Sequence, residues 1–235
     1  MKNMLSKCNS SLKVDKIDGV LAVLMICYDF IYIYTIKYII LDSGIYKSFL
    51  TYFDNISFAR FLFYIPFGLL RLFPIFIILK YRRQSLKSIG FNKVKILKQI
   101  TIGIVLYIPL YLLILISNWG LGISINLNLM SIWNFLYYLI NIGLVEEIVF
   151  RGFIQQRLKG VIKNKYVNIL VVAFIFGIGH IPFRLAQSNL TFIQVFISVI
   201  PAMCLHIYFL CIYKAGHNSI LSPTITHALA DFIII

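Results

Sequence analysis

The chain has 235 residues, of which 60% are hydrophobic and only 13% are charged. Soluble domains carry about a quarter charged residues, so this composition excludes a soluble globular protein and predicts a membrane protein. The formal net charge is +14, but the positive residues flank apolar runs, which is typical of topology signals and argues against a nucleic-acid-binding protein.

Seven apolar segments approach the roughly 20 residues that a membrane-spanning helix needs. In chain order they are Gly19–Leu41, Phe58–Leu79, Ile100–Ser117, a segment that starts at Ile132, Tyr166–Ile181, Leu190–Tyr213 and Asn218–Ile235. These runs are continuous and do not alternate with polar residues, which excludes a transmembrane barrel. The predicted fold class is therefore all-α: a polytopic transmembrane helical bundle that forms one membrane domain over residues 1–235.

The orientation of this bundle follows from its basic segments. Residues 80–98 contain seven Lys and Arg residues and no acid, which predicts a cytoplasmic linker between the second and third spans. Alternation from this linker places the uncharged loop Asn118–Ser131 outside and the N-terminus, with its lysines, in the cytoplasm. We expect a multi-pass protein of a plasma membrane.

The first two spans contain four charged residues. Lys37 and Arg60 lie near span ends, where we expect their side chains to extend toward the membrane surface. Asp29 and Arg71 lie deeper, and two alternatives stay open: they pair with each other, or each faces water separately. Residues 1–131, with the basic linker 80–98, thus form an N-terminal part that precedes a polar-motif core over residues 132–235.

From residue 132 onward, few ionisable residues lie inside the apolar segments. Such groups are costly in a membrane and are functional candidates by default. The set is Glu146, Glu147, Arg151, His180, His206, His227 and Asp231, and its two glutamates are the only ones in the chain. Glu147 and Arg151 are four residues apart and can pair on one helical face, whereas Glu146 is rotated by about 100° and faces elsewhere.

The depth of these residues in the membrane indicates whether they can meet. If the helix that carries Glu146 continues to Leu158, a rise of about 1.5 Å per residue places Glu146, His180, His227 and Asp231 in one layer, at depths of roughly 15 to 22 Å. Gly177 and Gly179, just before His180, permit close approach of another helix. His227 and Asp231 are four residues apart and share a helical face. His206 is expected to be a structural histidine of the bundle.

This set of residues indicates hydrolysis by an activated water. A carboxylate in low-dielectric surroundings suits proton transfer near neutral pH, and imidazoles can position water or stabilise an oxyanion. One glutamate and two histidines also match a catalytic zinc site, although the HExxH signature is absent. Metal dependence therefore stays open at this point.

Three motifs resemble those of the CPBP family, the CAAX prenyl proteases and bacteriocin-processing intramembrane proteases that were formerly called Abi proteins. The motifs are Glu146-Glu147-x-x-x-Arg151, Phe176-x-x-x-His180 and His227-x-x-x-Asp231, in this order. Their contexts, VEEIVFRGFIQQRL and NSILSPTITHALADF, are also similar to those of the family. The resemblance covers about residues 132–235, whereas the first three spans match only in general hydrophobic character.

The resemblance implies an intramembrane peptidase in which Glu146 is the general base and His180 assists it. Glu147 and Arg151 would support the helix, and His227 with residue 231 would stabilise the oxyanion. We expect no cofactor, while a divalent metal such as zinc, held by Glu146, His180 and His227, is the alternative. Many members of the family carry Asn where this chain has Asp231. Because an ionised carboxylate cannot donate a hydrogen bond, Asp231 must be protonated, orient His227 or bind a metal.

The expected substrates are small membrane-associated peptides or proteins, such as bacteriocin leaders, pheromones, self-immunity targets or CAAX-like sequences in a bacterial membrane. The expected partners are this peptide or membrane-protein substrate and the lipid bilayer, without nucleic acid and with the oligomeric state open. A catalytically inactive scaffold or regulator of another membrane protein is the second hypothesis. A transporter is the third, and it is disfavoured because no inverted repeat is evident.

Overall fold

The computed structural model describes residues 14–92, 95–119, 132–185 and 191–233, and this part of the chain is all-helical, as predicted. The N-terminal part contains α2 (Lys16–Tyr34), which continues as a π-helical segment (Thr35–Leu41), then α3 (Ile45–Leu50), α4 (Ile56–Tyr81), a 3-10 turn (Leu86–Ile89) and α5 (Ile96–Trp119). The C-terminal part contains α6 (Ile132–Leu136), π-helical segments (Tyr137–Leu144 and Glu147–Ile154), α7 (Gln155–Arg157), a 3-10 turn (Leu158–Gly160), α8 (Lys165–Ile178), α9 (Ile181–Leu185), α10 (Phe192–Ile197), α11 (Val199–Ala215) and α12 (Leu221–Ile233).

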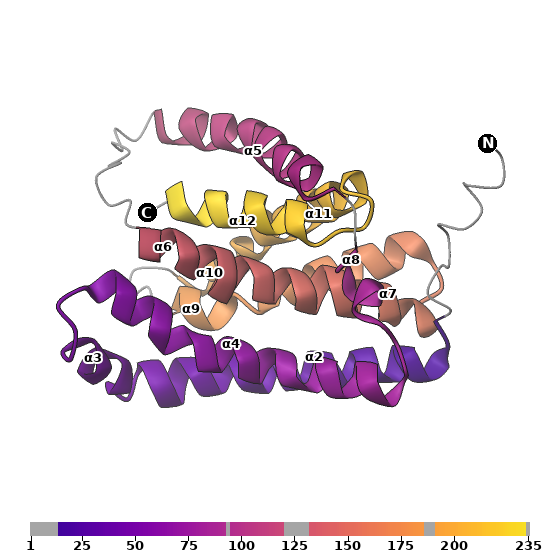
Figure 1. Cartoon of the computed structure of the whole chain (residues 1–235), viewed down its shortest axis with the longest axis horizontal. Coiled ribbons are helices and arrows are strands. Elements are labelled where there is room, and N and C mark those ends of the chain that lie inside the picture. Colours follow the sequence, from indigo (N-terminus) through magenta and orange to yellow (C-terminus); the bar gives the residue numbers. More distant parts are fainter. Residues whose placement is uncertain (1–13, 93–94, 120–131, 186–190, 234–235) are drawn as a thin grey trace.

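Six helices of the described part are long and apolar enough to cross a membrane. They are Lys16–Leu41, Ile56–Tyr81, Ile96–Leu113, Ile132–Gly160, Lys165–Leu185 and Phe192–Ala215. The seventh predicted span corresponds to α12, which has 13 residues and packs between α5 and the helix that starts with α6 (Figure 1). The last two residues predicted for it lie outside the described part of the chain.

The helix that runs from α6 through α7, here called the central helix, is continuous to Gly160, as the sequence analysis supposed. It lies between α4 on one side and α12 on the other (Figure 1). Its residues 147–155 are all buried, and at Gly152 a side-chain Cβ would lie 2.5 Å from the carbonyl oxygen of Ile89. Only glycine permits this approach of the cytoplasmic linker to the central helix. The centre of the bundle is therefore a helix that carries the two glutamates.

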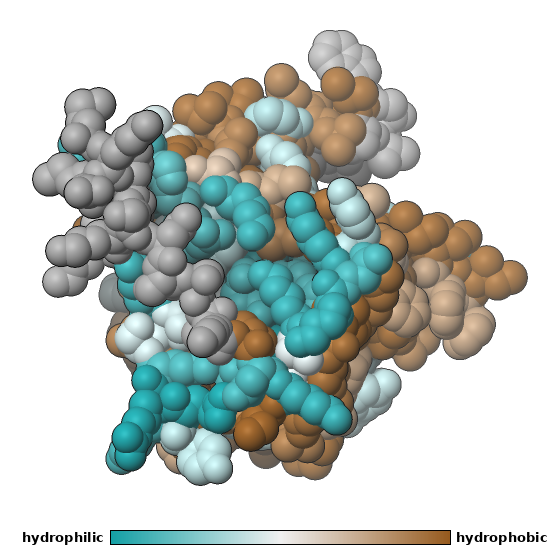
Figure 2. Space-filling view, turned by 90° about the vertical axis from the view of Figure 1, so that its right-hand side faces the viewer, coloured by the Kyte–Doolittle hydropathy of each residue, from teal (hydrophilic) through white to brown (hydrophobic). Residues whose placement is uncertain are grey.

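The basic segments gather at one end of the molecule, where α2 begins and both α4 and the central helix end (Figure 1). Figure 2 shows hydrophilic side chains gathered over this end, with hydrophobic side chains along the flanks. Arg82 pairs there with Asp15 at 2.5 Å and with Asp18 at 3.1 Å, and Arg157 donates to Gln84. This is the end that the sequence predicts to be cytoplasmic. Residues 120–131 of the predicted outer loop and the lysines before residue 14 lie outside the described residues.

Candidate active site

Glu147 and Arg151 form the ion pair that their spacing predicts. The Arg151 Nη1 atom lies 3.0 Å from Glu147 Oε1, and both side chains are fully buried. The guanidinium also lies over the rings of Phe176 and Phe209, at 4.7 and 5.2 Å from their centroids. The pair is therefore enclosed by α8 and α11 and has no access to a substrate.

Glu147 has a second partner that the sequence analysis missed. Its Oε1 atom lies 3.0 Å from His227 Nδ1 of α12. Because an ionised carboxylate only accepts hydrogen bonds, Nδ1 is the donor and carries a proton. This contact fixes the tautomer of His227 and directs its Nε2 atom toward Glu146 and Asp231.

Glu146 faces a different side of the helix, as predicted, and its side chain is 15% exposed. Its Oε1 atom lies 3.4 Å from Arg71 Nη1, and its Oε2 atom lies 3.9 Å from His227 Nε2. Within the described residues, Oε2 has no hydrogen-bond partner although it is buried. Glu146 thus has one oxygen held by a cation and one oxygen available to accept a hydrogen bond.

Arg71 and Asp29 pair with each other, which decides between the two alternatives that the sequence left open, pairing or separate exposure to water. The Arg71 Nε and Nη2 atoms lie 2.6 and 3.0 Å from the two carboxylate oxygens of Asp29, in a bidentate arrangement. The remaining nitrogen reaches Glu146. No local pattern in the sequence indicates this contact, which joins α2, α4 and the central helix.

His180 lies in the turn between α8 and α9, beyond the last residue of α8. Its Nδ1 atom lies 2.8 Å from the carbonyl oxygen of Phe176, and its ring packs on the Phe176 ring. Because a carbonyl only accepts, Nδ1 carries the proton, and in a neutral imidazole Nε2 is then an acceptor. Among the described residues, no hydrogen bond or ion pair joins His180 to Glu146 or Asp231, so the structure does not bring these side chains into direct contact.

Asp231 lies at the open side of the cluster, with its side chain 34% exposed. Its Oδ2 atom is 3.5 Å from His227 Nε2. The ring of His227 thus has carboxylates on three sides, from Glu147, Asp231 and Glu146. Such surroundings stabilise positive charge on an imidazole.

His206 is the structural histidine that the sequence analysis expected. It is fully buried, its Nε2 atom lies 3.2 Å from the Oε1 atom of Gln155, and its carbonyl faces Arg151. Phe150 and Phe176 pack against its ring. It therefore stabilises the packing of α11 on the central helix.

The donor groups do not form a ready metal site. In the described ranges, no three His, Cys, Asp or Glu side chains are arranged to hold a metal ion. Glu146, His180 and His227 were the predicted ligands. The guanidinium of Arg71 beside Glu146 would repel a divalent cation there. These residues fit a hydrogen-bonded cluster better than a zinc ion.

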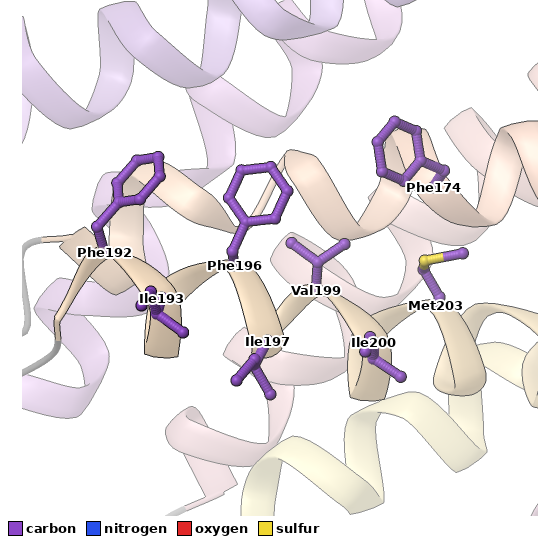
Figure 3. A pocket seen from close by; sticks show the side chains of 8 residues that line it. All are labelled: Phe174, Phe192, Ile193, Phe196, Ile197, Val199, Ile200 and Met203. Atoms are coloured by element: carbon purple, nitrogen blue, oxygen red, sulfur yellow. The ribbon is translucent and has the colours of Figure 1, made fainter.

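An apolar groove of about 440 Å³ lies nearby on α8, α10 and α11 (Figure 3). Its lining consists of Phe174, Phe192, Ile193, Phe196, Ile197, Val199, Ile200 and Met203. None of these side chains can transfer a proton or hold an ion, so the groove cannot carry out the chemistry. Titratable side chains lie instead in the polar cluster inside the bundle.

The comparisons with known proteins agree with the predicted resemblance. The family model described as Rce1-like, type II CAAX prenyl endopeptidase, matches residues 128–233. No curated protein and no solved structure matches the chain. The matched segment contains all six predicted site residues, whereas Asp29 and Arg71 lie outside it.

Proposed function

We propose that this multi-pass membrane protein, whose residues 128–233 match the Rce1-like family of CAAX prenyl endopeptidases, hydrolyses peptide bonds with a water that Glu146 activates. The observation that carries this proposal is the free oxygen of Glu146. Oε2 is buried, accepts no hydrogen bond from any described group and lies beside His227. A general base needs such an acceptor within reach of the water from which it takes a proton.

The proposed reaction begins when the oxygen of the water attacks the carbonyl carbon of the scissile peptide bond. Glu146 takes a proton from the water, and the carbonyl oxygen becomes an oxyanion. The tetrahedral intermediate then collapses, the C–N bond breaks, and Glu146 returns the proton to the leaving amine. The products are a carboxylic acid and an amine, and Glu146 is again a carboxylate.

The two histidines have different parts in this mechanism. His180 presents an acceptor at Nε2 when it is neutral, so it can orient the attacking water. His227 must donate to the oxyanion through Nε2, which requires a proton on both ring nitrogens. The three carboxylates around the ring support this charged form. Asp231 then acts on the charge and orientation of His227 and needs no proton of its own.

The substrates that we propose are small membrane-associated peptides or proteins, such as bacteriocin, pheromone or CAAX-like sequences, in a bacterial plasma membrane. The location of the polar cluster supports this class, because Glu146 lies on a helix that spans the membrane. A substrate must therefore enter the bundle with its scissile bond in an extended conformation. The core over residues 132–235 would supply the chemistry, while the N-terminal spans would enclose it.

The test is cleavage of a co-expressed membrane peptide by the wild-type protein and by Glu146→Ala. We expect Glu146→Ala to abolish cleavage while membrane insertion stays intact, because the loss of a general base costs about 10²- to 10⁴-fold in rate. Cleavage at the wild-type rate would exclude Glu146 as the base. If neither the wild-type protein nor Glu146→Ala cleaves the peptide, the result would instead favour the hypothesis of a catalytically inactive scaffold.

A second experiment addresses the metal. We expect the purified protein to keep its cleavage rate after prolonged treatment with a chelator, because Arg71 beside Glu146 disfavours a divalent cation. Metal analysis of the same sample provides the control. Loss of activity that zinc restores would replace this mechanism with a metal-dependent one.

A further inference from the structure

Arg60 of α4 lies in a group of aromatic rings at the end of the bundle opposite the basic segments. Its guanidinium carbon is 4.2 Å from the ring centroid of Tyr137 and 5.5 Å from that of Tyr138. Tyr64 packs edge-on against Tyr137, and Tyr46 of α3 packs against Tyr64. The sequence predicts that Arg60 extends to the membrane surface, but its side chain lies among these rings and is only partly exposed.

No Asp or Glu side chain neutralises Arg60 in the described part of the chain. All eight Asp and Glu residues of the chain lie within the described ranges. Their ion pairs join Asp15 and Asp18 to Arg82, Asp42 to Lys37, Asp29 and Glu146 to Arg71, Glu147 to Arg151, and Asp231 to His227. Asp54 is exposed and forms no ion pair in the described part. Arg60 is therefore a half-buried cation in a membrane span, and no described Asp or Glu side chain pairs with it.

The tyrosines stabilise this cation only in part. A cation over an aromatic face gains only a modest stabilisation, because the rings carry no net charge. Charged residues within membrane spans are costly and usually pair with an opposite charge. The planar guanidinium matches a carboxylate in shape and in its paired donors.

The arginine and its tyrosines adjoin the candidate active site. The ring centroid of Tyr138 lies 6.5 Å from that of Phe232, the residue that follows Asp231. Tyr138 precedes Glu146 by eight residues on the central helix, which corresponds to about 12 Å at 1.5 Å per residue. An extended peptide covers this distance with roughly three or four residues.

We propose that Arg60, on the rings of Tyr137 and Tyr138, binds a carboxylate of the peptide substrate a few residues away from the scissile bond. The carboxylate is either the C-terminal group of the peptide or an Asp or Glu side chain, since both offer the same two oxygens. This subsite rests on the proposed peptidase function. It adds the requirement that the peptide substrate carries a negative charge at one position. It makes Arg60 a specificity-determining residue, apart from the groups that activate water.

The test is a binding measurement that does not depend on turnover. Glu146→Gln protein in detergent is titrated with an extended peptide of alanine, leucine and valine, made as a C-terminal acid, as the C-terminal amide, and as the amide with one internal Asp. We expect the amide to bind roughly tenfold or more weakly than one of the acidic forms. Whichever acidic form binds best identifies the source of the carboxylate.

Variants then assign this preference to Arg60. In the Glu146→Gln background, Arg60→Gln should remove the difference between the acidic peptide and the amide, while Arg60→Lys should keep part of it. Lys37→Gln is the matched control, because it removes a span cation that already pairs with Asp42, and it should leave the preference unchanged. Equal binding of all peptides by the unmodified Arg60 protein, or a preference that persists in Arg60→Gln, would overturn the subsite. Absence of cleavage by the wild-type protein would instead refute the peptidase, so the two failures are distinguishable.

Discussion

Two polar networks, one at the basic end of the bundle and one deeper inside it, differ in how completely their buried groups are paired. The basic-end network consists of Asp15, Asp18, Arg82, Gln84, Ser88 and Arg157. The catalytic layer consists of Asp29, Arg71, Glu146, Glu147, Arg151, His180, His227 and Asp231. Within the described residues, no buried side-chain atom of the first network lacks a hydrogen-bond partner, whereas Glu146 Oε2, Glu147 Oε2 and Arg151 Nε of the second do.

We propose that the completely paired basic-end network is part of the scaffold, whereas the incompletely paired layer holds the catalytic groups. Both networks join helices that are distant in sequence, and both bury arginines. A buried polar atom without a partner is costly, so a structural network is expected to satisfy all of its groups. Of the unpaired atoms named above, only Glu146 Oε2 belongs to a partly exposed side chain, and it is the acceptor that the proposed mechanism uses. Variants in the two networks should therefore affect different measurable quantities.

Among the variants that test this comparison, the largest effect on kcat is expected for His227. His227→Ala removes the proposed oxyanion donor, and loss of one such donor lowers kcat by about 10²- to 10³-fold. His227→Gln should retain part of the rate, because its amide can donate at a similar position. The measurement is single-turnover cleavage, with the melting temperature of each variant as a control. An unchanged kcat in His227→Ala would remove His227 from the mechanism.

An intermediate effect is expected for Arg71, which we propose to be a positioning residue for Glu146. Arg71→Gln should lower kcat by about 10- to 100-fold with little change in KM, because small displacements of a catalytic group are costly. The exchange Asp29→Arg with Arg71→Asp provides the matched control. It keeps an ion pair between α2 and α4 but places a carboxylate beside Glu146. If the exchanged protein recovers the wild-type kcat, the pair has only a structural function.

The sequence predicts the parts of the catalytic layer that depend on local geometry. The pair between Glu147 and Arg151 follows from a spacing of four residues on a helix, and Glu146 faces elsewhere for the same reason. The common depth of Glu146, His227 and Asp231 follows from counting residues along the spans. These three side chains do meet in the structure.

The contacts between distant segments could not be predicted in this way. Arg71 and Glu146 are separated by 75 residues, and Glu147 and His227 by 80. Which side chains meet across the bundle depends on how the helices pack, and no local pattern encodes that packing. From their depth alone, Asp29 and Arg71 could either pair with each other or face water separately. They form an ion pair because α2 packs on α4. Similarly, the short α12 is tolerated because neighbouring helices enclose it.

The smallest effect on turnover is expected at the basic-end network, where the fully buried Asp18 accepts hydrogen bonds from Arg82 and Gln84. Asp18→Ala leaves these donors without their partner, which costs about 1 to 3 kcal/mol of folding free energy. The melting temperature should fall by several degrees, while kcat per folded molecule stays within about twofold, because Asp18 has no contact with the catalytic layer. Asp54→Ala, at an exposed aspartate, is the matched control and should change neither quantity. A kcat that falls with Asp18→Ala at temperatures where the variant is fully folded would show that the two networks are coupled. Their separation into scaffold and chemistry would then fail.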